Sequence, residues 1–294
     1  MKPGSPEWVR LVTASKVAAI LGLSPWDSPR TTWHKMRGDL PSEDGNNADA
    51  KSRGHYLEGG VLAWWADRHG LAAGDPIHLT QQPRLTLSNW GAATPDAMGM
   101  DDGHGNAFVM DAKTAASADD WGTPGTDEAP AYYAAQAMWQ LACHPTASVA
   151  YIAVLFGRPQ LEFAEYIIER DDDLIASIVL RCKAFHDSLT DDDAAPALSD
   201  HVAEYDAIRK VHADIDREAV AVIPDDLAHR YLTDLAHAER ADATKARVLD
   251  LMGTARLAKT ESGLFLARRQ PKGQAVTLVR TASLPALEPM EEAS

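Results

Sequence analysis

The stretch TPDAMGMDDGHGNAFVMDAKT, residues 94–114, decides the fold of this chain. Two apolar runs, residues 90–94 and 107–113, have the composition of short strands. The segment between them that is richest in Asp and Gly, residues 101–105, has the composition of a hairpin turn. The sequence therefore predicts that this part of the chain folds back on itself as a β-hairpin.

Such a hairpin would gather charged side chains at one place. It can bring Asp96, at the end of the first run, next to Asp111 in the second. Residues two apart in a strand point to the same face, so Asp111 and Lys113 project together. Glu58, on the preceding predicted helix, is a third candidate carboxylate. Converging carboxylates repel each other unless a cation lies between them, and oxygen ligands suit Mg²⁺ or Mn²⁺.

The rest of the chain predicts helices around a mixed sheet, which is an α+β fold. One compact domain is expected over residues 1–195, a helical accessory region ending in a small hairpin over 196–284, and a disordered tail over 285–294. Apolar periodicity and turn residues predict helices over 6–22, 31–36, 52–69, 130–143, 171–186 and 225–257, and strands over 148–155, 161–168, 265–269 and 275–280.

Composition excludes several classes of protein. The 294 residues are 45% hydrophobic, as in ordinary globular chains, and no apolar run is long enough to predict a membrane span. The net charge of -15 argues against a protein that coats nucleic acid by bulk charge. Two cysteines are too few for a four-cysteine cluster or a disulfide framework. The expected compartment is a reducing cytoplasm.

Charge is unevenly spread along the chain. Residues 230–280 hold ten Lys/Arg against five Asp/Glu, a local net charge of +5. This segment is either an amphipathic accessory region that packs on the core, or an extension that contacts DNA or a partner. In the second case Arg268, Arg269 and Lys272 would follow phosphates near the predicted hairpin.

A Pro-Asp followed at a distance by Asp-x-Lys is a weak pattern by itself, and it also describes two surface aspartates and a solvated lysine. Further stretches in the same order make it specific, and together they resemble the lambda exonuclease and YqaJ-type viral recombinase family of the PD-(D/E)xK superfamily. The similarity covers about residues 8–187. The stretches are RLVTAS at 10–15, AAILG at 18–22, Gly54 with Leu57-Glu58, TPD at 94–96, DAKT at 111–114, PAYYAAQ at 130–136, and IIERD at 167–171.

This chain departs from the family pattern at three positions. Asp111 stands where Glu is common, Ala97 where Gly usually follows Pro-Asp, and Met138 where many relatives have a second Gln. The resemblance implies a restriction-endonuclease-like core with a central mixed sheet flanked by helices.

The resemblance also implies a role for each matching residue. Asp96, Asp111 and the backbone carbonyl of Ala112 would hold the metal, and Glu58 would support the metal or its water. Lys113 would orient the nucleophilic water or stabilise charge on the phosphate.

Three further roles follow from the same resemblance. Gln136 would position the water or the scissile phosphate, although alone it is equally a satisfied polar residue. Arg10 and Ser15 would hold the 5′ phosphate of the DNA, since arginine is a bidentate phosphate ligand. Ser15 alone is a good helix N-cap.

The activity implied is that of a Mg²⁺-dependent exonuclease, with Mn²⁺ as a substitute and two ions in each site. It would digest linear double-stranded DNA from 5′ ends and leave 3′ single strands. The implied partners are that DNA, a single-strand annealing protein and two further copies in a homotrimer, with no membrane. The implied setting is phage recombination in a bacterial cytoplasm.

Three alternatives stay open at this point. One is another nuclease on the same core, either RecB-like or of the CRISPR-associated iron–sulfur kind, for which two cysteines are too few. Another is an endonuclease. The third is a non-catalytic DNA-binding protein, against which the intact set of Asp96, Asp111 and Lys113 argues.

Overall fold

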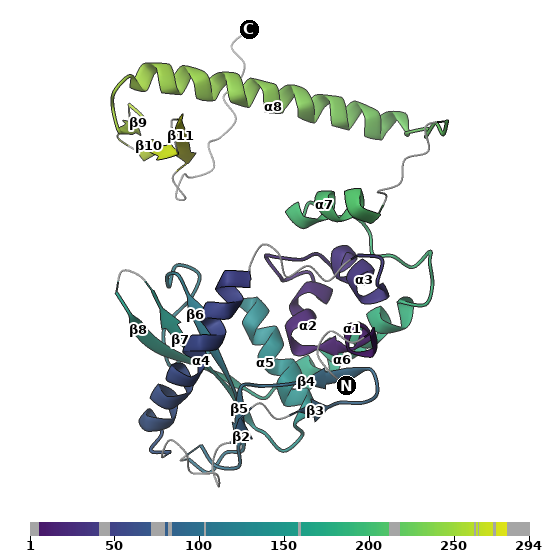
Figure 1. The fold of residues 1–294 in the computed structure, drawn as a ribbon, viewed down its shortest axis with the longest axis vertical. Helices are drawn as coiled ribbons and strands as arrows, with labels where there is room; N and C mark the ends of the chain where they lie inside the picture. The colour runs from purple at the N-terminus through teal and green to yellow at the C-terminus, as the bar shows by residue number, and fades with distance from the viewer. Residues whose placement is uncertain are drawn as a thin grey trace. The chain divides into compact units, whose positions relative to one another are not determined.

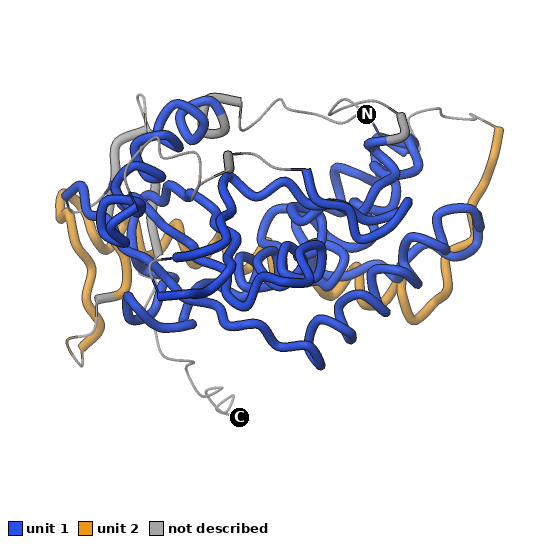
Figure 2. The backbone as a smooth tube through the Cα atoms, turned by 90° about the horizontal axis from the view of Figure 1, so that it is seen from below, with its two compact units in different colours: residues 1–215 blue, residues 216–294 orange. Residues whose placement is uncertain are grey.

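The chain divides into two compact units, Met1–Ile215 and Asp216–Ser294 (Figure 2). The first unit extends past the boundary expected at residue 195, because helix α7 (Val202–Val211) contacts helix α3 (Pro29–Arg37). The computed structural model describes residues 6–40, 48–71, 80–81, 84–102, 104–157, 160–211, 218–261, 263, 265–272 and 275–280.

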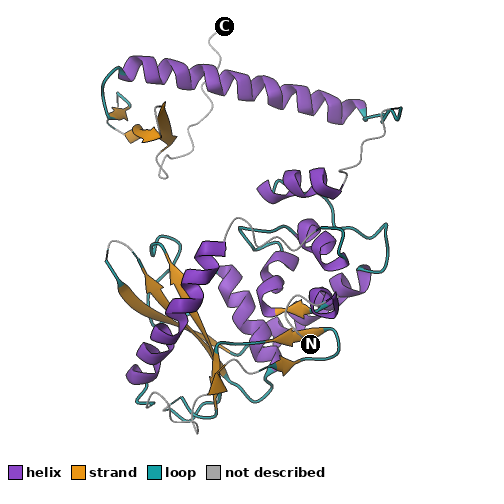
Figure 3. Ribbon diagram, viewed as in Figure 1, coloured by secondary structure: helices purple, strands orange, loops and turns teal. Residues whose placement is uncertain are grey.

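A five-stranded mixed sheet carries the core of the first unit, in the order β2-β5-β6-β7-β8 (Figures 1 and 3). Strands β6 and β7 run parallel, and the other neighbours run antiparallel. A parallel pair needs a crossover connection, which helix α5 (Ala131–Cys143) supplies. The predicted α+β class is therefore confirmed. The strands are β2 Thr80–Gln81, β5 Ala97–Gly99, β6 Phe108–Ala115, β7 Val149–Phe156 and β8 Glu162–Glu169.

Helices α4 (Ala48–Arg68) and α5 cover opposite faces of this sheet. Alternate residues of a strand point to opposite faces, so Phe108 and Met110 of β6 pack in the core cluster under α4. Val109, between them, packs in the cluster that contains the buried residues of α5. Asp111 and Lys113 share the parity of Val109 and therefore project toward α5.

A second, three-stranded sheet has the order β1-β4-β3 and corrects one expectation. The strand before Asp96, β4 (Gly91–Ala93), does not pair with β6 but lies between β1 (Val12–Thr13) and β3 (Leu85–Thr86). The strand that pairs with β6 is the short β5, after Asp96. Pro95 separates the two strands, and because proline lacks an N–H it interrupts the ladder at that point.

The N-terminal helix expected over 6–22 is two helices, α1 (Pro6–Arg10) and α2 (Ala14–Ile20), with β1 between them. Thr13 takes the N-cap position of α2 but its side chain makes no capping bond. Helix α6 (Asp172–Ser188) starts as expected, since Asp171 accepts a hydrogen bond from the Leu174 amide at 2.9 Å.

The second unit consists of one long helix and a small antiparallel sheet. Helix α8 (Asp225–Met252) is followed by β9 (Leu257–Lys259), β10 (Phe265–Lys272) and β11 (Ala275–Arg280), with β10 in the middle. The predicted hairpin is present as β10 and β11, and β9 adds a strand that the sequence did not predict. The tail expected to be disordered, 285–294, lies outside the described residues.

Within the part of the chain that the structure describes, no helix combines the length and the apolar character needed to span a membrane.

Candidate active site

The β5–β6 hairpin places Asp96 beside the second half of the motif. Ala97 pairs with Met110, so Asp96 lies opposite the start of the sequence Asp111-Ala112-Lys113. Oδ2 of Asp96 accepts a hydrogen bond from the Ala112 amide at 2.7 Å. Sequence reasoning predicted this approach of Asp96 to Asp111, although it assigned the wrong strand to the pairing.

Asp111 is held from two sides. It is 4% exposed, and its Oδ2 accepts hydrogen bonds from Lys113 Nζ at 2.8 Å and from Gln136 Nε2. Its Oδ1 accepts a hydrogen bond from Gln140 Nε2 at 2.8 Å. Gln136 and Gln140 are one turn apart on α5, the helix that covers this face of the sheet. The carboxylate therefore sits between a lysine on its own strand and two amides on α5.

The electrostatics of the site are those of crowded negative charge. Burial and the neighbouring charge of Asp111 raise the pKa of Asp96 to about 7, and Glu58 contributes in the same direction. Burial alone would lower the pKa of Lys113, but the charges of Asp111 and Asp96 outweigh it and the pKa is raised. Lys113 is therefore a cation that forms an ion pair with Asp111 and is also stabilised by the charge of Asp96. Its ammonium also lies 5.4 Å from the centre of the Tyr133 ring.

Glu58 lies on α4, which covers the other face of the sheet. Its side chain is 19% exposed and lies 3.5 Å from His55 Nδ1. The negative charge of Glu58 also raises the pKa of Asp96, by less than burial and the charge of Asp111 do. The structure thus brings Asp96, Asp111, Lys113 and Gln136 together, and places Glu58 within electrostatic range of them.

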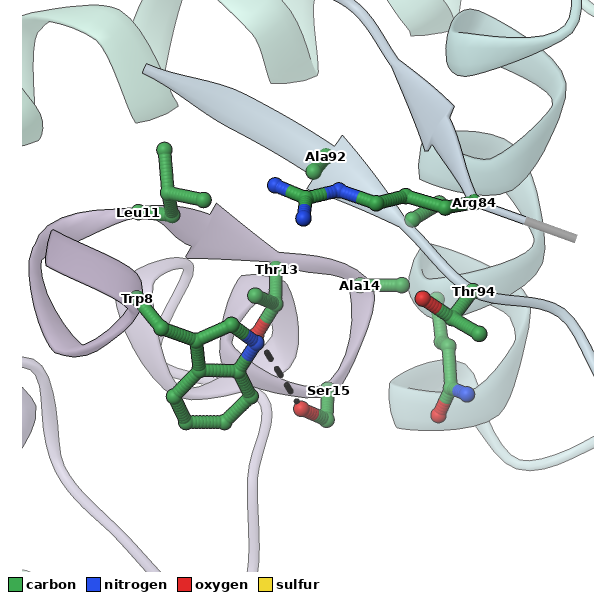
Figure 4. A pocket seen from close by; sticks show the side chains of 10 residues that line it. Trp8, Leu11, Thr13, Ala14, Ser15, Arg84, Ala92 and Thr94 are labelled. Carbon is green, nitrogen blue, oxygen red and sulfur yellow. Dashed lines mark hydrogen bonds between the residues drawn. The ribbon is translucent and has the colours of Figure 1, made fainter. Parts of the chain in front are cut away.

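A pocket opens next to these residues, and Gln136 belongs to both. Figure 4 shows it from close by, with Arg84 extending over the pocket and a hydrogen bond of 3.2 Å joining the hydroxyls of Thr13 and Ser15. Thr94 adds a third hydroxyl, two residues before Asp96. The lining residues are Trp8, Leu11, Thr13, Ala14, Ser15, Arg84, Ala92, Ala93, Thr94 and Gln136.

The lining supplies a different arginine from the one the sequence predicted. Ser15 lines the pocket, but Arg10 is an exposed residue at the end of α1 and is not part of the lining. Arg84, just before β3, is the cation of the lining. Among the described lining residues there are one arginine, three hydroxyls and no carboxylate. These groups suit an anion with several oxygens.

Sequence reasoning missed two residues here, Arg84 and Gln140. Gln140 carried a usable signal, because it follows Gln136 by four residues on a helix and therefore shares its face. No signal in the sequence points to Arg84, because its position in the pocket lining depends on how β3, β4 and β1 assemble.

The donor atoms near Asp96 fit a hard divalent cation. The pKa of Asp96 is raised by burial first and by the charge of Asp111 second, and a bound cation would relieve the repulsion between the two carboxylates. Among the described residues no group of three or more His, Cys, Asp or Glu forms a ready metal cage. Mg²⁺ commonly binds through one or two carboxylates and keeps water or phosphate oxygens as its other ligands, which fits Asp96 and Asp111.

Asp96 of the Pro-Asp pair thus lies beside Asp111 and Lys113 of the Asp-x-Lys sequence, at the β5–β6 hairpin of a mixed sheet flanked by helices. The model of the YqaJ-like viral recombinase domain matches residues 7–147, which include all the residues of the site. Over these residues, just under half of the chain, the sequence is similar to this family.

Solved structures with a similar fold include an alkaline exonuclease, LHK-Exo, from Laribacter hongkongensis. It is 22% identical, with a TM-score of 0.47 over 70% of this chain and 94% of that chain. LHK-Exo in complex with dAMP is 21% identical, with a TM-score of 0.48 and the same coverage, 70% and 94%. A phage-related exonuclease from Haemophilus somnus 129PT is 17% identical, with a TM-score of 0.46 over 61% and 93% of the two chains. No curated protein matches the chain significantly.

Proposed function

We propose that this chain is a divalent-metal-dependent exonuclease that digests linear double-stranded DNA from its 5′ ends and leaves 3′ single strands. One observation carries the proposal: Gln136 joins the cluster of Asp96, Asp111 and Lys113 to the pocket lined by Arg84. In this proposal the carboxylate cluster is the site of phosphodiester cleavage, and the neighbouring pocket binds the terminal phosphate.

Asp96 and Asp111 hold the metal in this proposal, with Mg²⁺ as the ion, Mn²⁺ as its substitute, and two ions in each site. Glu58 supports the metal or its water. The Ala112 carbonyl is a further ligand, because the N–H and C=O of one strand residue point to the same side, and this N–H points to Asp96. The bound ion supplies positive charge that polarises the phosphodiester and acidifies an attacking water.

Lys113 and Gln136 act on the substrate. The Lys113 ammonium stays protonated between the carboxylates and stabilises the negative charge that grows on the phosphate during attack. Gln136 has one hydrogen bond to Asp111 and also borders the pocket, so its amide orients the water or the scissile phosphate relative to the carboxylates. Both groups are fixed before substrate binds, which lowers the cost of orienting it.

The pocket accounts for the choice of DNA end. A 5′ phosphate carries more charge and more free oxygens than an internal phosphodiester, and the hydroxyls of Ser15 and Thr94 beside Arg84 would bind those oxygens. A strand that ends in this pocket presents its first internal phosphodiester to the neighbouring carboxylates. Digestion would therefore begin at an end and not within the duplex.

The family resemblance extends the proposal to partners. We infer a homotrimer that encloses the duplex and a single-strand annealing protein that receives the 3′ strand. A closed ring would turn modest phosphate contacts into processive digestion of DNA. The setting is phage-type recombination in a bacterial cytoplasm.

The test is a product analysis with Mg²⁺ on a linear duplex whose strands are end-labelled separately, beside a closed circular duplex. We expect loss of label from 5′ ends only, with the circle intact. Nicked circles or internal fragments would instead identify an endonuclease. An absence of degradation with Mg²⁺ and with Mn²⁺ would identify a DNA-binding protein without catalysis.

A further inference from the structure

Gln140 contacts the candidate metal ligand Asp111 from inside the core. It is 1% exposed, and its Nε2 donates a hydrogen bond of 2.8 Å to Oδ1 of Asp111. A buried amide costs free energy unless its polar atoms are hydrogen-bonded, so this contact stabilises Gln140 as well as the carboxylate. Gln140 lines neither the pocket nor an exposed surface.

Helix α5 holds this amide rigidly. Trp139, next to Gln140, is 0% exposed and its Nε1 donates a hydrogen bond to the Ala92 carbonyl at 3.0 Å. Leu141, on the other side, is also 0% exposed. The backbone on both sides of Gln140 is therefore anchored in the core, and the amide is presented to Asp111 at a fixed position.

The hydrogen bond from Gln140 restricts rotation of the Asp111 carboxylate about its Cβ–Cγ bond. Rotation about the Cβ–Cγ bond of an aspartate is broad, so the two oxygens of the carboxylate do not have fixed places. Lys113 attracts the carboxylate from one side only, through Oδ2. Gln136 also donates to Oδ2, whereas Gln140 donates to Oδ1, and the contact on Oδ1 opposes rotation of both oxygens toward the ammonium.

We propose that Gln140 is a positioning residue that orients the Asp111 carboxylate for a divalent cation. The inference rests on the proposed metal-dependent function and adds a residue to it. Gln140 contacts no substrate in this proposal. Loss of such a supporting contact typically lowers metal affinity by about 10- to 100-fold.

The experiment measures Mn²⁺ binding by the full chain without DNA, from the electron paramagnetic resonance signal of free Mn²⁺. Gln140→Met keeps the size of the side chain and removes its amide. Leu141→Met is the matched control, because it exchanges a neighbouring buried side chain on the same helix without touching Asp111. We expect Gln140→Met to weaken Mn²⁺ binding by about 10- to 100-fold and Leu141→Met to leave it unchanged.

Nuclease activity gives a second measurement. We expect Gln140→Met to raise the Mg²⁺ concentration for half-maximal cleavage by a similar factor, with the rate at saturating Mg²⁺ largely restored. A role limited to folding would instead lower the rate equally at all Mg²⁺ concentrations. If Gln140→Met does not fold, Gln140→Asn keeps an amide in the core but shortens it by one methylene, and the same loss of Mn²⁺ affinity is expected.

Two results would overturn the inference, and they are distinguishable. If folded Gln140→Met binds Mn²⁺ as tightly as the wild type, Gln140 is not a positioning residue. That result does not contradict the proposed nuclease function. A wild-type chain that binds no Mn²⁺ removes both the positioning role and the metal-dependent function.

Discussion

Gln136 donates a hydrogen bond to Oδ2 of Asp111 and also lines the pocket that contains Arg84. The side chain therefore belongs to the carboxylate cluster and to the anion pocket. Whatever binds in the pocket lies within one side chain of the candidate metal ligand. This adjacency links the choice of a DNA end to the place of cleavage in the proposed reaction.

The first prediction concerns Asp111. Asp111→Asn keeps the shape of the side chain and removes its charge, so a divalent cation loses a principal ligand. We expect cleavage of a linear duplex to be abolished with Mg²⁺, while binding of the same duplex is retained, because affinity for DNA comes mainly from phosphate contacts elsewhere. End-labelled digestion and a gel-shift assay measure the two properties.

The matched control for Asp111 is Asp173→Asn, an exposed aspartate in the first turn of α6. It makes the same chemical change far along the chain from the motif and is expected to cleave like the wild type. Native-rate cleavage by Asp111→Asn would show that the site is assigned to the wrong residues.

The second prediction separates the role of Lys113 from metal binding. Lys113→Met removes the ammonium next to Asp111, and we expect cleavage to fall about 10²- to 10³-fold, as when one charge-stabilising donor is lost. Mn²⁺ affinity should hold or rise, because the carboxylates lose a competing cation. Mn²⁺ titration and single-turnover digestion test the two effects.

Lys183→Met, on α6, is the matched control for Lys113. Its ammonium pairs with Asp187 at 2.5 Å on the surface, so its loss is expected to leave cleavage and Mn²⁺ binding unchanged. A Lys113→Met variant that loses Mn²⁺ affinity in parallel with cleavage would place Lys113 in the support of the metal site and not in charge stabilisation.

The hairpin shows what local sequence can predict. Turn residues between two apolar runs predict that the chain reverses, and strand alternation then puts Asp111 and Lys113 on one face. Both expectations are confirmed by the pairing of β5 with β6 and by the hydrogen bond between Lys113 and Asp111. The choice of β5 over the strand before Asp96 was not predictable, because these three residues form a strand through their pairing with β2 and β6, which lie elsewhere in the chain.

The lining of the pocket could not be predicted from the local sequence. Arg10 and the pocket residue Arg84 are both exposed, and they look alike in a sequence because both are single arginines beside apolar runs. Which one reaches the pocket depends on the assembly of β1, β4 and β3, strands that are distant in the chain. The family resemblance implies Arg10 as the phosphate ligand, whereas the pocket lining contains Arg84.

The third prediction decides between these two arginines. Arg84→Ala removes the cation of the pocket lining, and a charge-assisted hydrogen bond contributes about 1.5–3 kcal/mol, or roughly 10- to 100-fold in affinity. We expect digestion of a duplex with 5′ phosphates to slow by that factor at limiting DNA, and digestion of a duplex with 5′ hydroxyls to change little. The preference for phosphate is the measured quantity.

Arg10→Ala is the natural comparison, because it removes an arginine that lies outside the pocket. It is expected to keep the full preference for 5′ phosphate. If Arg10→Ala loses the preference and Arg84→Ala keeps it, the 5′ phosphate is bound by Arg10, as the sequence predicted.

The fourth prediction tests the turn that holds the two site strands together. Asp102 is 0% exposed and its carboxylate accepts hydrogen bonds from the Tyr151 hydroxyl at 2.7 Å, the His104 amide at 2.8 Å, and the backbone and side-chain amides of Asn106, both at 3.1 Å. Burial alone would raise the pKa of Asp102, but these hydrogen bonds outweigh it and lower the pKa to about 2.

A carboxylate with a lowered pKa stabilises the fold above its unfolded value of 3.8 and loses that contribution as pH falls toward 2. We expect Asp102→Ala to lower the free energy of unfolding by about 2–4 kcal/mol at pH 7, because several donors lose their acceptor. The difference from the wild type should shrink between pH 4 and pH 2. Urea unfolding followed by circular dichroism measures it, and Asp101→Ala, at an exposed position in the same turn, should cost less than about 1 kcal/mol. Equal losses in the two variants would mean that the buried network does not hold the hairpin.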